Sequence, residues 1–167
     1  MTGLLNSLTQ IALLRKDPSA LPSSAASVVV FTVGYVAADV LIGRAGHFRV
    51  VLPRSALELA LTLPFFWLLL ALTRRTHRFA QTVNAAFGVY VLAAPLLALL
   101  LLPMRTSGPF TLLATALYTG IAIWYILVAG YVFKCALDTH LVTGFAIAVA
   151  WILGTRAVSN VFFGPVS

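Results

Sequence analysis

The chain has 167 residues, of which 61% are hydrophobic and only 9% are charged. Soluble domains carry about 25% charged residues, so this composition excludes a soluble globular protein and predicts a membrane protein. The net charge of +7 does not indicate nucleic-acid binding, because the basic residues lie at the ends of apolar runs rather than in a stripe with aromatic residues.

The first predicted element is an amphipathic helix over residues 3–16. Its apolar residues fall on one face at helical spacing: Leu4, Leu5, Leu8, Ile11 and Ala12. The stretch is too short to cross a bilayer, so we predict an interfacial helix that lies on the membrane surface. A helix docked on a partner subunit is the alternative.

Five long apolar runs follow, and each approaches the roughly 20 residues that a helix needs to cross a bilayer. The predicted spans are about 25–43, 55–73, 79–102, 110–133 and 141–163. The backbone in lipid must satisfy its own hydrogen bonds, which helices do. We therefore predict an all-α polytopic transmembrane bundle that forms one membrane domain over residues 1–167.

Small residues spaced by four predict where helices pack closely. Gly34 and Ala38 form such a pair in the first span. In the last span, Ala146, Ala150 and Gly154 form a longer stripe, which we predict to be its helix-packing face.

Aromatic residues lie in the middle of span 110–133 rather than only at its ends: Tyr118, Trp124, Tyr125 and Tyr131. Aromatic residues at this depth are typical of a face packed on other helices. The alternative is a pocket for a lipid or a quinone-like ligand.

Three ionisable residues lie within the spans, and the topology places Asp39, Glu58 and Arg156 in the same half of the bilayer. Charges in hydrocarbon are costly unless they are paired or near water. We therefore predict an intramembrane cluster in which Arg156 pairs with Asp39 or Glu58. Local pairs, Arg54 with Glu58 and Arg44 with Asp39, are the alternative.

Other chemistry has little support in the sequence. Cys135, Asp138 and His140 contain the residue types of a thiol catalyst or a metal site, but one cysteine and no second cluster favour a solvated turn. His47 and His77 lie among arginines, which suits contact with lipid head groups. We expect no enzyme, metal or cofactor. A proton path is disfavoured, because the last three spans have no acid in their middle.

The densest basic cluster consists of Arg74, Arg75 and Arg78, which we predict to contact lipid head groups or a partner. Basic residues favour the cytoplasmic side of a membrane. This cluster therefore predicts a cytoplasmic N-terminus, although the basic loop 44–54 favours the opposite orientation.

The last third of the chain resembles the final two spans of the Yip family of five-span membrane proteins. The resemblance rests on the run WYILVAG at 124–130, a short polar turn and the small residues of 143–154; residues 88–90 followed by Pro95 are compatible with it. It implies a non-enzymatic bundle that binds partners within the membrane. The acidic N-terminal motif of the eukaryotic members, which act in vesicle traffic, is missing here. We expect a bacterial inner-membrane protein.

These observations lead us to expect a non-catalytic accessory, assembly or scaffold subunit of a larger inner-membrane complex. Its partners would be membrane lipids and other integral membrane subunits. The alternative is a small homo-oligomeric transporter or lipid-handling protein, with a cavity beneath Pro64 and Pro95 that holds Asp39, Glu58 and Arg156.

Overall fold

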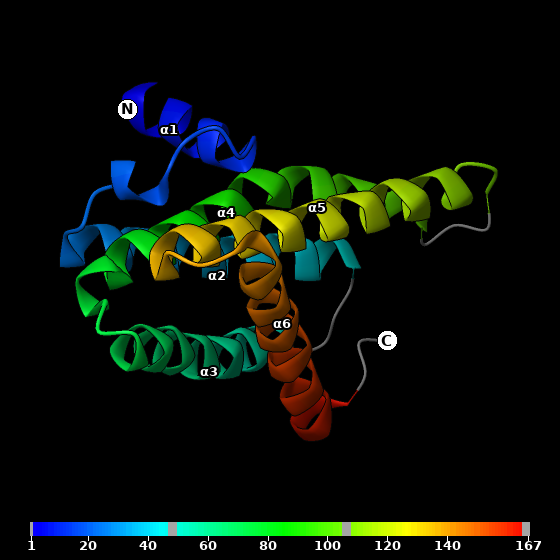
Figure 1. Ribbon diagram of the computed structural model, residues 1–167. Coiled ribbons are helices and arrows are strands. Elements are labelled where there is room, and N and C mark those ends of the chain that lie inside the picture. The colour runs from blue at the N-terminus through cyan, green and yellow to red at the C-terminus, as the bar shows by residue number, and fades with distance from the viewer. Residues whose placement is uncertain (1, 47–49, 105–107, 165–167) are drawn as a thin grey trace.

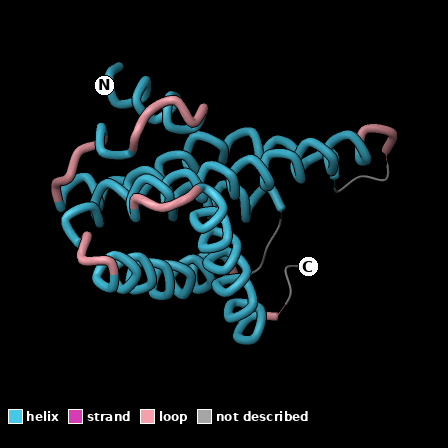
Figure 2. The backbone as a smooth tube through the Cα atoms, in the orientation of Figure 1, coloured by secondary structure: helices cyan, strands magenta, loops and turns pink. Residues whose placement is uncertain are grey.

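The computed structural model describes residues 2–46, 50–104 and 108–164, and its regular elements over these ranges are all helical (Figures 1 and 2). The long helices are α1 (Thr2–Ala12), α2 (Ala25–Gly46), α3 (Val51–Leu72), α4 (Phe79–Met104), α5 (Thr111–Leu137) and α6 (Leu141–Phe163). Two single 3₁₀ turns, η1 (Pro18–Ala20) and η2 (Thr76–Arg78), precede α2 and α4. Helices α2 to α6 are long and apolar enough to cross a membrane.

The predicted polytopic helical bundle is therefore confirmed, and the largest differences lie where charges end the apolar runs. Helix α3 begins at Val51 and includes Arg54, and α5 continues past Lys134. Long basic side chains bury their stems along apolar surface and keep their charged ends in polar surroundings. A basic residue thus ends a hydrophobic run without ending the helix.

Helix α4 lies at the centre of the bundle and packs against α1, α2, α3 and α5. Every residue from Thr82 to Val89 is buried. A helix that is apolar on all sides is expected in a core, and the small residues of this stretch let neighbouring backbones approach. The sequence order of the spans does not reveal this central position.

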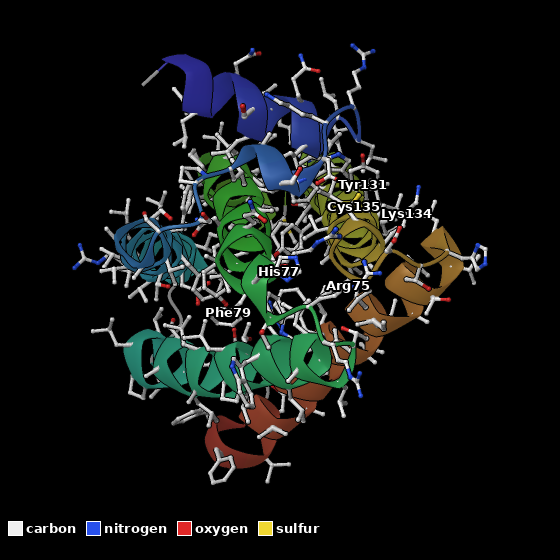
Figure 3. The ribbon with its side chains drawn as sticks, turned by 60° about the vertical axis from the view of Figure 1, so that its left-hand side comes forward. Arg75, His77, Phe79, Tyr131, Lys134 and Cys135 are labelled. Carbon is white, nitrogen blue, oxygen red and sulfur yellow. The ribbon has the colours of Figure 1, made fainter. Side chains whose placement is uncertain are left out.

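The helices are arranged in layers. Figure 1 shows α2, α4 and α5 side by side, with α1 over one face of this layer. Helices α3 and α6 contact each other and cross the opposite face. Figure 3 views the layer more nearly end-on, so that α3 and α6 are seen crossing below it.

The apolar face of α1 packs on the chain's own bundle. Leu8 and Ile11 are buried, whereas Leu5 stays exposed. A Cβ atom on Gly88 of α4 would lie 2.6 Å from a Leu8 methyl group and 2.9 Å from the Phe31 ring, so glycine leaves room here for side chains of α1 and α2. The indole N–H of Trp124 also donates to the carbonyl oxygen of α1's last residue, at 3.2 Å. The surface position of α1 stays a prediction.

One of the two predicted small-residue stripes packs within the chain, whereas the other faces outward. In α2, Ala38 is buried, and a Cβ atom on Gly34 would lie 3.3 Å from Val91 of α4. In α6, the predicted stripe of Ala146, Ala150 and Gly154 is exposed. The residues that α6 buries are Gly144, Ala148, Trp151 and Ser159. Gly144 and Ala148 form a second stripe with the same spacing, so periodicity could not select between the two.

Candidate functional site

A cavity of about 590 Å³ lies among α2, α3, α4, α5 and α6. It reaches the end of the bundle where α2 finishes, α3 begins and α6 finishes, because Gly43, Val51 and Phe163 line it there. Asp39, Glu58 and Arg156 all contribute to its wall. The structure thus brings the three predicted intramembrane charges to one site.

The cavity lies in a fork between α5 and α6. The two helices touch at Gly144 and Gly130, where a Cβ atom on Gly144 would overlap the carbonyl oxygen of Gly130. From this contact the helices diverge (Figure 1). Ala122 on α5 and Ile152 on α6 line the cavity between the arms, so apolar walls lead into it.

The inner end of the cavity is closed by aromatic side chains. Trp151, which lines the cavity, packs on Phe66 and Phe133 with ring centroids 4.9 and 6.0 Å apart. Phe66 and Phe133 are fully buried. The Trp151 indole donates to the Thr62 hydroxyl at 3.0 Å, roughly 16 Å along α3 from its start at 1.5 Å per residue. The polar wall therefore ends near the middle of the bundle.

Asp39 of α2 is held by hydroxyl groups from two other helices. The hydroxyls of Ser55 on α3 and Tyr90 on α4 donate to its two carboxylate oxygens at 2.7 and 2.6 Å. Among the described residues, Asp39 makes no ion pair. The predicted alternative partner of Asp39 was Arg44, which is exposed. The two residues are five apart in α2, and this spacing places their side chains on different faces of the helix.

Glu58 pairs with Arg54, the local partner that was predicted as the alternative to Arg156. Its carboxylate lies 3.5 Å from Nε of Arg54, one turn earlier in α3, and both side chains are only 13% exposed. The Tyr35 hydroxyl donates to Glu58 at 3.1 Å, and the Ser159 hydroxyl donates to it at 3.5 Å. Arg54 also donates to the side-chain oxygen of Asn160 near the end of α6. Arg54 thus joins α3 to α6 while it neutralises Glu58.

The predicted pair between Arg156 and Asp39 or Glu58 is not formed. Arg156 lines the cavity from α6 and is exposed within it. Over the ranges that the structure describes, its guanidinium has neither an ion-pair partner nor a hydrogen bond. The predicted second span began at residue 55, after Arg54. Helix α3 begins at Val51 instead, so Arg54 and Glu58 lie on one face of it and pair with each other.

Two tyrosines of this site, Tyr35 and Tyr90, were not predicted from the sequence, whereas Tyr118 and Tyr125 were named as candidates for a pocket. The rings of Tyr35, Tyr90 and Tyr125 form a row along the cavity wall, with centroids 5.0 Å apart for the first two and 5.6 Å apart for the last two. A tyrosine within an apolar span signals a polar partner for its hydroxyl, but the sequence does not say which one. The mid-span aromatics divide between both predicted roles, since Tyr118 lines the cavity and Trp124 packs on α1.

The basic cluster lies at the other end of the bundle (Figure 3). Arg75 makes an ion pair with Asp138 at 3.2 Å, and Arg78 donates to the carbonyl oxygen of Cys135 at 2.6 Å. Both arginines therefore join the α3–α4 connection to the end of α5. Arg74 is exposed, and its predicted contact with lipid head groups stays a prediction.

No group of three metal-binding side chains occurs in the part of the chain that the structure describes. The candidate residues Cys135, Asp138 and His140 lie near the end of α5 and the start of α6. The interpretation of His47 concerns a residue outside the described ranges.

No protein-family model, curated protein or solved structure matches the chain. The resemblance to the Yip family therefore stays a prediction. The fold and the five apolar helices define a multi-pass helical membrane protein.

Proposed function

We propose that this protein is a non-catalytic multi-pass membrane protein that binds a lipid or a lipid-like amphiphile in the cavity lined by the five helices α2 to α6. The observation that carries the proposal is a cavity of about 590 Å³ whose wall combines aromatic and aliphatic side chains with the guanidinium of Arg156, which forms no ion pair with any described residue. Ligand sites typically enclose about 300–1,000 Å³ and have apolar walls with a few polar groups.

The closed inner end of the cavity favours binding over conduction. A transporter needs a polar path that becomes continuous across the membrane. Here the packed rings of Phe66, Phe133 and Trp151 stand where such a path would continue. A ligand would therefore occupy one half of the bilayer.

The fork between α5 and α6 supports access from the side. Ala122 and Ile126 on α5 and Ile152 on α6 give it apolar walls. An acyl chain can lie along these walls while the polar head group meets Arg156. With a cytoplasmic N-terminus in a bacterial inner membrane, the cavity would face the periplasmic leaflet.

An accessory or scaffold role is the second candidate, and an exposed face of α6 favours it. Ala146, Ala150 and Gly154 form a small-residue stripe, and nothing lies within 4 Å of a Cβ atom built on Gly154. Such stripes admit close packing of a helix from another integral membrane subunit.

The test is to measure lipid retention by native mass spectrometry after purification in a mild detergent. Ala122→Trp fills the cavity, whereas Ala116→Trp adds the same side chain at an exposed position of α5 and is the matched control. We expect the wild type and Ala116→Trp to retain one bound amphiphile per chain and Ala122→Trp to lose it. Equal retention by the two variants, or no retention by the wild type, contradicts the proposal.

A further inference from the structure

Among the described residues, two opposite charges of the cavity form no ion pair, and together they describe a ligand. Arg54 and Glu58 neutralise each other. Asp39 and Arg156 line the same cavity, and neither makes an ion pair among the described residues. Charges inside a membrane are costly unless they are paired. A ligand that carries both a cation and an anion would supply the two missing partners.

The wall around Asp39 is rich in hydrogen-bond acceptors. The hydroxyl protons of Tyr35, Tyr90 and Tyr125 are donated to Glu58, Asp39 and a backbone carbonyl respectively. Each phenolic oxygen keeps a lone pair, and a carboxylate accepts only. A primary ammonium, with three N–H donors and a positive charge, matches this wall.

The opposite wall offers a donor for an anion. Arg156 belongs to α6, whereas Asp39 and the three tyrosines belong to the layer of α2, α4 and α5. A guanidinium presents five N–H groups in a fork that binds a phosphate through two parallel hydrogen bonds. Asp39 and Arg156 thus come from the two different helix layers that meet at the cavity.

We infer that the cavity selects a zwitterionic phospholipid whose head group carries a primary ammonium, with the ammonium on Asp39 and the phosphate on Arg156. This inference rests on the proposed function and names the ligand class. A choline head group has no N–H to donate to Asp39. A glycerol head group brings no cation to it.

The experiment measures binding of three lipids to the delipidated full chain by native mass spectrometry. The probes are phosphatidylethanolamine, phosphatidylcholine and phosphatidylglycerol with identical acyl chains. A charge-assisted hydrogen bond corresponds to about tenfold in affinity or more, so we expect the ethanolamine lipid to bind at least about tenfold more tightly than the other two. Equal affinity for all three lipids overturns the inference and leaves the proposed function standing.

Variants of Asp39 and Arg156 test which residue binds the ammonium and which binds the phosphate. Asp39→Asn keeps the shape of the side chain and should abolish the preference for ethanolamine, whereas Arg156→Gln should weaken all three lipids about tenfold or more. Asp138→Asn, which changes an exposed acid at the other end of the bundle, is the control. An unchanged preference in Asp39→Asn overturns the inference. Arg156→Lys keeps the charge but loses the paired hydrogen bonds, so its phosphate binding should fall between those of the wild type and Arg156→Gln.

The proposed function fails in a different way. If no lipid binds and Ala122→Trp behaves as the wild type does, the proposed function and the inferred head-group selectivity are both overturned.

Discussion

Gly144→Ala should destabilise the protein strongly, because Gly144 sets the contact from which α5 and α6 diverge. A Cβ atom at this position would overlap the carbonyl oxygen of Gly130 and lie 2.8 Å from the backbone nitrogen of Lys134. Both are backbone atoms of a helix, so the contact cannot be relieved by a side-chain rotation. Overpacking costs about 1–3 kcal/mol, occasionally more, and we expect the upper end of that range.

Gly154→Ala is the matched control for Gly144→Ala. It lies in the same helix, and nothing is within 4 Å of its added methyl group. Replacing glycine by alanine within a helix stabilises by about 0.5–1 kcal/mol. Because both glycines lie within α6, both variants gain this stabilisation, and their free energies of unfolding should differ by the overpacking cost, about 3 kcal/mol.

Unfolding by dodecyl sulfate in mixed micelles measures this difference, with far-ultraviolet circular dichroism as the signal. Tryptophan fluorescence is a second signal, to which Trp151 of the aromatic cluster contributes together with Trp67 and Trp124. Equal stability of Gly144→Ala and Gly154→Ala would refute the close approach of α5 and α6.

Three further predictions test other parts of the bundle. Thr62→Val removes the acceptor of the buried Trp151 indole N–H, so the free energy of unfolding in mixed micelles should fall by about 1–3 kcal/mol. Unchanged stability would refute this hydrogen bond. Gly88→Ala crowds a Leu8 methyl group of α1 and the Phe31 ring of α2, so amide hydrogen exchange should rise in both helices, and unchanged exchange in α1 would contradict its packing on α4. Arg75→Gln breaks a pair whose acid, Asp138, is 77% exposed, so its stability should fall by less than about 1 kcal/mol; a larger loss would contradict the solvated geometry.

The membrane-spanning helices could be predicted from the sequence because each apolar run exceeds what a soluble core needs and is bounded by polar residues. The common half of the bilayer for Asp39, Glu58 and Arg156 followed from chain direction alone. Their proximity in one cavity required tertiary packing, since α3 and α6 had to cross the same face of the central layer.

The pairing within the site depended on one turn of helix. Arg54 pairs with Glu58 because α3 begins at Val51. The ends of helices are among the features that a sequence predicts least precisely. Asp39 obtained hydroxyl partners from Ser55 and Tyr90, which are distant in sequence and carry no local signal. A one-dimensional pattern cannot rank such partners.

The choice between the faces of α6 shows the same limit. Gly144 with Ala148 and Ala146 with Ala150 have identical spacing, and both pairs predict a packing stripe. The deciding factor was complementarity with Gly130 on α5, where two glycines meet. The packing stripe of α6 can be identified only once the neighbouring span, α5, is placed beside it.

The most direct test of the central claim is an experimental structure of the chain crystallised from a lipid mesophase. We predict density for an amphiphile in the fork between α5 and α6, with its polar end at Arg156 and its inner end against Trp151. A cavity without such density, in which Arg156 has turned to pair directly with Asp39, would contradict it.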